Sequence, residues 1–153
     1  MMGIARQNNV VFSYRKAADI MTDPMTVSIN LIAVPGIRDS YITDRVLQNT
    51  RDYSMAMYVM DIQHYDEDGN RLFADNPKRP DVMQTVEAFE GRRVDNNFAA
   101  TYFPDVFVQD DTNNRPVFVP SSVAVYGALS YNDSVAFPWF APAGFNRGAL
   151  GFV

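Results

Sequence analysis

Three apolar segments separated by helical patterns constrain the fold of this chain more than any other feature. Residues 26–34 and 55–62 are dense in apolar residues, and residues 98–108 form a third such segment, interrupted at Pro104. Near-continuous apolar segments of this length predict strands buried on both faces, as in a parallel sheet. The order strand, helix, strand, helix, strand predicts an α/β layered domain with a mainly parallel central sheet and flanking helices.

The two helices between these strands are predicted from their first residues and their apolar spacing. Thr43 is expected to cap a helix that runs to about Tyr53 and places Val46, Leu47 and Thr50 on its buried side. Together with the strands before and after it, this helix forms a βαβ unit, which is expected to cross over right-handed.

The second helix is predicted over residues 81–92, with Pro80 at its first helical position. Val82, Val86 and Phe89 recur at helical spacing, so we expect them to share one side of this helix.

Residues 1–25 are expected to form an N-terminal arm and a short helix, followed by an α/β portion over residues 26–153. An apolar patch at residues 10–12 suggests an arm or a weak strand. Apolar residues at spacings of three and four predict a helix over residues 14–21. Pro24 is expected to stop it, because proline disfavours helical backbone in the preceding residue.

The remaining segments are predicted from composition. Residues 64–79 are the most polar part of the chain and indicate an exposed loop or a small excursion. Residues 110–114 indicate a turn. A short strand is expected over residues 117–119, and residues 120–122 are expected to cap a helix over 123–129.

Composition limits the partners of the chain. The 153 residues carry a net charge of −5, and the basic residues are scattered, which argues against nucleic acid and anionic lipid. The sequence has no cysteine, which excludes disulfides and thiolate metal sites. No apolar run approaches the roughly 20 residues of a membrane helix, so direct membrane insertion is not expected, and neither is a signal peptide.

One catalytic arrangement can be written from the sequence. His64 is the only histidine, and Asp61 with Ser121 or Ser122 could complete an α/β hydrolase-like set. The Gly-x-Ser-x-Gly turn that usually carries such a serine is absent. A surface histidine is therefore the favoured interpretation.

Two loops resemble ligand sites in part. Residues 66–70, Asp-Glu-Asp-Gly-Asn, match the start of a calcium loop but lack its downstream glutamate, so a simple turn is favoured. Pro35 and Gly36 follow a predicted strand, where a phosphate-binding turn can begin. A dinucleotide site needs three glycines, so a tight turn is favoured here as well.

The aromatic C-terminal segment is a candidate binding surface. Trp139 and Phe140 could serve a carbohydrate- or protein-binding module, but without basic neighbours they do not favour nucleic acid. Four acidic residues could meet a basic partner, although solvated turns explain most of them: Asp105, Asp110, Asp111 and Asp133. We therefore expect no catalytic, cofactor-binding or metal-binding residue, no cofactor, and a protein that is not an enzyme.

Five segments in chain order resemble motifs of contractile-tail sheath proteins, which occur in phages and phage-like injection devices. The first contains Asn30-Leu-Ile-Ala-Val-Pro-Gly and is similar to the family's "Asn-Leu-apolar-Pro-Gly" strand. The segments are residues 28–37, 57–62, 99–106, 119–128 and 132–144. The resemblance spans roughly residues 26–150.

The resemblance implies a structural subunit of the virion tail, assembled in the host cytoplasm. Its expected partners are other sheath subunits in hexameric rings and a helical array, the inner tail tube protein, the baseplate and the tail terminator. Contraction of the array would drive the tube through a cell envelope for genome ejection. The family's tube-facing C-terminal domain should follow Ala149, so the chain is expected to be the central part of a larger subunit.

Overall fold

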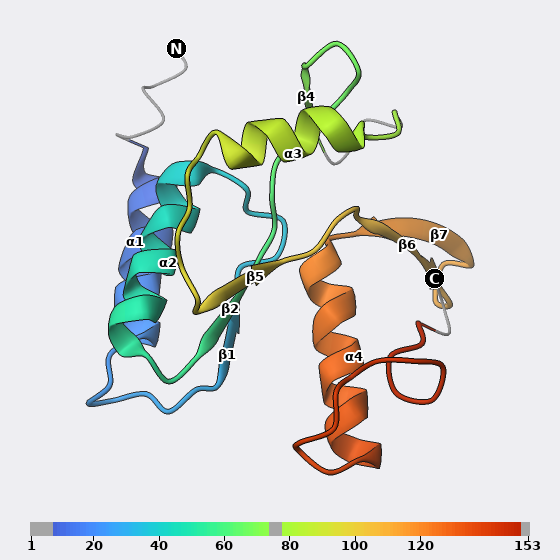
Figure 1. The fold of residues 1–153 in the computed structure, drawn as a ribbon. Helices are drawn as coiled ribbons and strands as arrows, with labels where there is room; N and C mark the ends of the chain where they lie inside the picture. The colour runs from blue at the N-terminus through green and yellow to red at the C-terminus, as the bar shows by residue number, and fades with distance from the viewer. Residues whose placement is uncertain (1–7, 74–77, 151–153) are drawn as a thin grey trace. The chain divides into compact units, whose positions relative to one another are not determined.

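The computed structural model describes residues 8–73 and 78–150. The chain divides into two compact units, Met1–Thr101 and Tyr102–Val153 (Figure 1). The first unit carries a parallel sheet with helices, and the second carries a two-stranded ribbon and one long helix within the described residues.

The sheet of the first unit has the order β1 (Leu31–Ala33), β2 (Met57–Met60), β5 (Ala99–Thr101). Both pairings are parallel, with Leu31 opposite Met57 and Tyr58 opposite Ala99. The prediction of parallel strands from these three apolar segments is therefore confirmed.

Burial in this sheet differs from the prediction. Tyr58, Val59 and Met60 of β2 are at most 2% exposed, whereas β1 and β5 are half-buried along their lengths. Strands buried on both faces were expected throughout, but only β2 has a neighbouring strand on each side.

The first strand is also shorter than residues 26–34. The Tyr53 hydroxyl donates to the carbonyl of Val27 and accepts from the amide of Ile29, both at 3.1 Å. These backbone groups therefore bond to a side chain instead of a neighbouring strand, and β1 begins only at Leu31.

Helix α2 (Ser40–Tyr53) joins β1 to β2 and packs on β2. Its cap is Asp39, whose side chain accepts from the amide of Tyr41 at 2.9 Å, so the expected cap at Thr43 is wrong. Thr43 lies inside the helix and has no exposed surface. The predicted burial of Val46, Leu47 and Thr50 is confirmed.

Helix α1 (Asn9–Met21) packs on α2 (Figure 1). The weak strand considered for residues 10–12 is wrong, because the Asn8 side chain accepts from the amide of Val10 and caps a helix there. Asp19 bonds to Arg45 at 2.8 Å and to Asn49 at 2.7 Å on α2. These bonds fix the register between the two helices.

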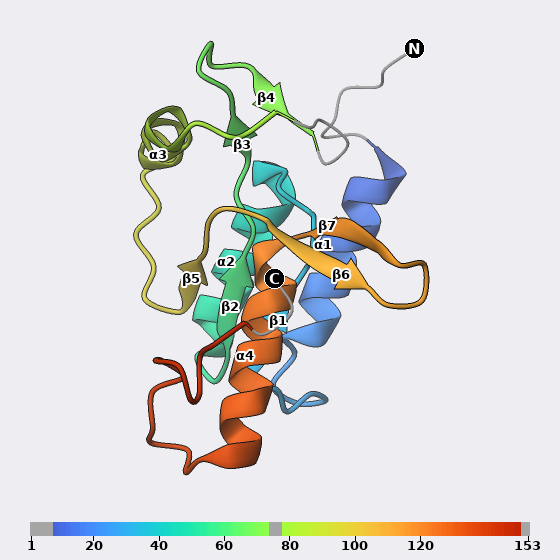
Figure 2. The same cartoon turned by 90° about the vertical axis from the view of Figure 1, so that its right-hand side faces the viewer.

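The polar stretch after β2 contains a hairpin of β3 (His64–Tyr65) and β4 (Arg71–Leu72), beside α3 (Val82–Glu90) (Figure 2). Asp81 caps α3 by accepting from the amide of Gln84 at 2.8 Å. Pro80 therefore lies outside the helix, and its expected place at the first helical position is wrong.

The face of α3 that packs inward differs from the expected apolar side. Thr85 is 1% exposed and its Oγ1 accepts from the amide of Tyr65, while Val82 and Val86 are largely exposed. The polar bond to β3 places Thr85 against the hairpin, which turns the two valines outward.

In the second unit, β6 (Val106–Asp110) pairs antiparallel with β7 (Arg115–Val119), and α4 (Ser121–Val135) follows. The turn predicted at residues 110–114 is confirmed. The expected interruption at Pro104 is confirmed, and residues 98–108 supply two strands, because β5 and β6 belong to different sheets on either side of a cis Phe103–Pro104 bond.

The hydrophobic core of the described residues lies in the first unit. Every buried hydrophobic side chain in that set falls between Val11 and Leu72. The side chains buried in the second unit, among residues 102–150, are the polar Ser121, Ser122 and Asn132. The second unit therefore leaves its apolar side chains partly open to contact.

We expect Val46→Ala to lower the free energy of unfolding by about 2–3 kcal/mol, because it removes fully buried methyl groups and leaves a cavity. Val86→Ala is the matched control. Val86 is 45% exposed, and its replacement should change stability by less than about 0.5 kcal/mol. Urea unfolding followed by circular dichroism measures both, and equal losses would contradict the assigned core.

Candidate interaction surface

The residues of the hydrolase-like set fall in different units. His64 and Asp61 belong to the first unit, and Ser121 and Ser122 belong to the second. His64 is 6% exposed and lies opposite buried Leu72 in the β3–β4 hairpin, so the interpretation as a surface histidine is wrong. Ser121 Oγ donates to the carbonyl of Tyr102 at 2.8 Å.

The turn at Pro35 and Gly36 is a tight turn, as favoured from the sequence. Gly36 has a φ of 76°, and its amide donates to Asp61 Oδ2 at 2.9 Å. Asp61 is 2% exposed, so a buried carboxylate holds this turn from the end of β2. The amide of Gly36 thus bonds within the protein instead of facing a phosphate.

The partial calcium loop is a turn organised by one carboxylate. Asp66 Oδ1 accepts from the amides of Asp68 at 3.1 Å and Asn70 at 2.8 Å, and Oδ2 accepts from Lys78 at 3.3 Å. The backbone amide of Asn70 lowers the pKa of the Asp66 carboxyl, and Lys78 lowers it further. Residues 8–73 and 78–150 contain no group of three or more acidic or histidine side chains placed to hold a metal ion.

The aromatic residues after α4 form an exposed surface. Trp139 is 77% exposed and stacks on Phe137, with ring centroids 4.9 Å apart and planes within 3°. Phe145 is 98% exposed. We call these three residues together with Phe140 the tail surface. Exposed aromatic side chains that form a patch are typical of a site that another molecule covers.

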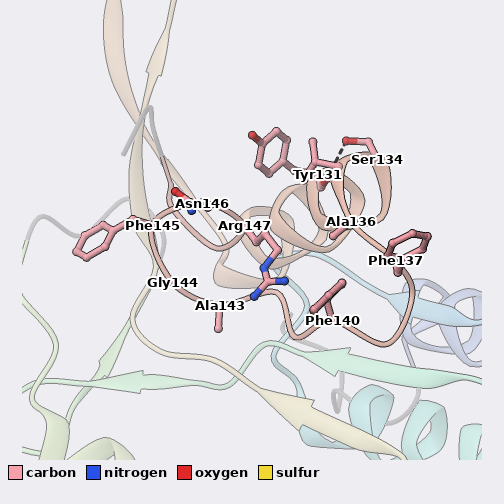
Figure 3. A pocket seen from close by; sticks show the side chains of 11 residues that line it. Tyr131, Ser134, Ala136, Phe137, Phe140, Ala143, Gly144, Phe145, Asn146 and Arg147 are labelled. Carbon is pink, nitrogen blue, oxygen red and sulfur yellow. Dashed lines mark hydrogen bonds between the residues drawn. The ribbon is translucent and has the colours of Figure 1, made fainter.

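A basic residue does accompany the tail surface, contrary to the sequence interpretation. The Arg147 guanidinium lies 4.6 Å from the centroid of the Phe140 ring. Figure 3 shows both side chains at the rim of a hollow of about 830 Å³, with Phe145 pointing away from them. A cation over an aromatic face can contribute to recognition of flat or anionic groups.

Two contacts that the sequence did not predict fix the loop that carries the tail surface, and the first of them ties it to α4. Asn132 is 3% exposed, and its Nδ2 donates to the carbonyl of Phe140 at 3.1 Å. Gly148 lies so close to Pro142 that a Cβ atom would meet its carbonyl oxygen at 2.7 Å. The sequence does not single out Asn132 or Gly148 for these contacts, because each contact is made to the backbone of a non-periodic loop.

An apolar groove runs between α4, the ribbon and the C-terminal loop. One part, of about 670 Å³, is lined by residues that include Val108, Val123 and Leu150. A second part, of about 300 Å³, includes Phe103, Val125 and Pro142. On the opposite face of the ribbon, Phe107 and Phe118 form an exposed cross-strand pair.

The acidic residues do not gather into one site. Asp110 accepts from the side chain and amide of Asn113 and from the amide of Thr112, which lowers the pKa of its carboxyl, with the Asn113 side chain contributing most. Asp111 lies in the same turn and is exposed, and Asp133 is exposed on α4. Asp105 lies before β6 and is half-buried. The Asp110 carboxylate thus stabilises a turn.

Comparison with known proteins gives a partial similarity. The chain is 37% identical over 57 residues to the tail sheath protein of Vibrio phage KVP40. These residues make up 37% of this chain and 8% of that protein. No protein-family model matches the chain. The resemblance to sheath proteins is therefore confirmed over part of the chain. Among the described helices, none is both long and apolar enough to cross a membrane.

We expect Asp66→Asn to lower the urea midpoint of the first unit at pH 7. A carboxyl with a depressed pKa stabilises the fold above its unfolded pKa of about 3.9, and this contribution is lost as the pH falls through the folded value. The two proteins should therefore converge near pH 2. Asp68→Asn, in the same turn and exposed, is the control. A gap that persists in acid would contradict the role of the carboxylate.

We expect Asn132→Ala to loosen the tail surface, because it removes the side chain that binds the Phe140 carbonyl. Trp139 is the only tryptophan in the sequence, so its fluorescence anisotropy reports on this loop. The anisotropy should fall in Asn132→Ala and stay unchanged in Asn113→Ala, whose side chain acts in the ribbon turn. Equal anisotropy in all three proteins would show that Asn132 does not hold the loop.

Proposed function

We propose that this chain is part of a structural subunit of a contractile tail sheath and acts without catalysis or a cofactor. The observation that carries the proposal is the similarity over 57 residues to a phage tail sheath protein. The five motif segments between residues 28 and 144 support it from the sequence.

The surfaces of the second unit also favour an assembly protein. Among residues 102–150, no hydrophobic side chain is buried, and the tail surface, the groove and the Phe107–Phe118 pair are all open. Exposed apolar surface of this kind is typical of sites that another polypeptide covers. A subunit that works between copies needs such surfaces more than it needs a catalytic cleft.

In the proposed assembly the principal partners are other copies of the subunit. Six subunits would form a ring, and rings would stack in a helical array around the inner tail tube protein, between the baseplate and the tail terminator. Head-to-tail contacts that do not close on themselves generate such arrays. Contraction would switch many of these contacts together and drive the tube through a cell envelope.

The location and the domain division follow from the same proposal. The subunit would be assembled in the host cytoplasm and reside in the virion tail. Residues 1–25 would form an arm with a short helix, and residues 26–153 would belong to the sheath core portion.

A protein- or carbohydrate-binding role of the tail surface is the second candidate. The stacked pair of Phe137 and Trp139 favours it, because a flat, exposed indole can lie against a sugar ring or an apolar side chain. Glycan-array binding that is lost in Trp139→Ala would support this alternative over the sheath.

The full-length gene product that contains this chain should polymerise into tubes of fixed diameter, visible by negative-stain electron microscopy. Phe107→Ser combined with Trp139→Ala should shorten or abolish the tubes, because both side chains are exposed and available to a neighbouring copy. Their loss should leave the circular dichroism spectrum unchanged.

Phe73→Ser is the control, because this side chain is 66% exposed and belongs to the first unit, whereas the tail surface and the ribbon belong to the second. Tubes of normal length in the double variant would remove these residues from the interface. A full-length product that stays monomeric at every concentration and salt condition would contradict the sheath proposal itself.

A further inference from the structure

A small pocket of about 140 Å³ is lined by residues of the first unit alone. Its lining comes from segments that follow β1 and β2 in the chain, from the hairpin, and from α3 and the residues after it. In open α/β sheets, ligands bind beyond the carboxyl ends of the parallel strands. The polar residues that line it are Arg38, Ser40, Gln63, Tyr65, Arg71 and Arg92.

The lining has an excess of positive charge. Arg38, Arg71 and Arg92 reach the pocket from three separate segments, and none of the described residues that line it is acidic. Asp44 bonds to Arg92 from outside the lining, and its own side chain is 60% exposed. The described lining residues therefore bring three guanidinium groups and no carboxylate to the pocket. A lining of this charge favours an anion as its ligand.

Arg92 is held in place with part of its hydrogen-bonding capacity unused. Its Nη2 donates to Thr43 Oγ1 at 2.9 Å and to Asp44, and its side chain is 19% exposed. Its Nε is buried and has no acceptor within the described part of the chain. A buried donor without an acceptor costs stability, and an oxyanion in the pocket could supply one.

The first turn of α2 also adds positive potential to the pocket. Ser40, the first residue of α2, lines the pocket, and the N-terminal end of a helix carries partial positive charge. Polar groups from Gln63 and Tyr65 complete the wall. The volume is below the roughly 300 Å³ of a typical small-molecule site, which limits the ligand to a single small group.

We propose that this pocket binds one oxyanion group, a phosphate or a carboxylate, through Arg38, Arg71 and Arg92. The group could be a free anion or an acidic side chain of a second copy of this chain, which carries a net charge of −5. Phosphate and carboxylate groups both present anionic oxygens that accept hydrogen bonds from guanidinium groups. The inference does not rest on the proposed sheath function.

The test uses inorganic phosphate as the probe, with the Nε–H resonances of the arginines followed by NMR in ¹⁵N-labelled protein. The Arg92 Nε–H signal should shift with a saturable dependence on phosphate, and sodium chloride at equal ionic strength should not reproduce the shift. Arg71→Gln should weaken phosphate binding about tenfold, as expected for the loss of a charge-assisted hydrogen bond.

Arg51→Gln is the matched control, because Arg51 is exposed in the last turn of α2 and does not line the pocket. It should bind phosphate as the parent does. Arg71 is also exposed, so Arg71→Gln is expected to fold, and its circular dichroism spectrum checks this. Any general effect of phosphate as a salt should be the same in Arg71→Gln and Arg51→Gln, so a difference between them reports on the pocket.

Sedimentation with and without phosphate separates the two sources of the anion. Phosphate binding without a change in association state assigns the pocket to a free oxyanion. Self-association that phosphate and Arg71→Gln both weaken assigns it to a carboxylate of a second copy. An Arg92 Nε–H signal that does not respond to phosphate, or an equal affinity in Arg71→Gln and the parent, would overturn the proposal.

Discussion

The burial of the central strand β2 beneath α2 is the interaction on which the rest of the first unit depends. Val46 and Thr50 of α2 and Tyr58 of β2 are completely buried, and burial raises the pKa of the Tyr58 hydroxyl. The other elements then attach to α2. Arg92 binds Thr43, Asn96 donates to the carbonyl of Leu47, and α1 packs along the helix. Most of these attachments are polar, so α2 supplies both the apolar core and the frame for the hydrogen bonds.

The second unit is held together by different means. Its turns depend on local carboxylate and amide bonds, such as those of Asp110 with Asn113, and its loop is tied to α4 by Asn132. Its apolar side chains line an open groove or face outward. Polar bonds of this kind fix a conformation without removing much apolar area from water. A unit built in this way keeps apolar area available for a partner.

The sequence predicted those elements whose buried residues recur at a regular spacing. It failed where a side chain takes the place of a backbone group as hydrogen-bond partner. The apolar periodicity around Val46 identified α2 and its buried side, and the apolar segments identified the parallel strands. Tyr53 shortened β1 by bonding the backbone of Val27 and Ile29. Thr85, which bonds Tyr65, shifted the buried side of α3 away from Val82 and Val86. Such bonds join residues 20 or more positions apart. No local sequence pattern predicts such bonds.

The amino-acid sequence by itself determined the α/β class, the parallel strands, the position of α2 and the resemblance to sheath proteins. Each of these depends only on local composition or on the order of motifs along the chain. Only the tertiary structure decided that His64 is buried, that Arg147 lies over Phe140, and that Arg38, Arg71 and Arg92 line one pocket. Charged side chains show no periodicity, and their proximity is set by how the strands and helices pack. Charged residues from separate segments therefore come together only when the chain packs, whereas the spacing of apolar residues is already present in the sequence.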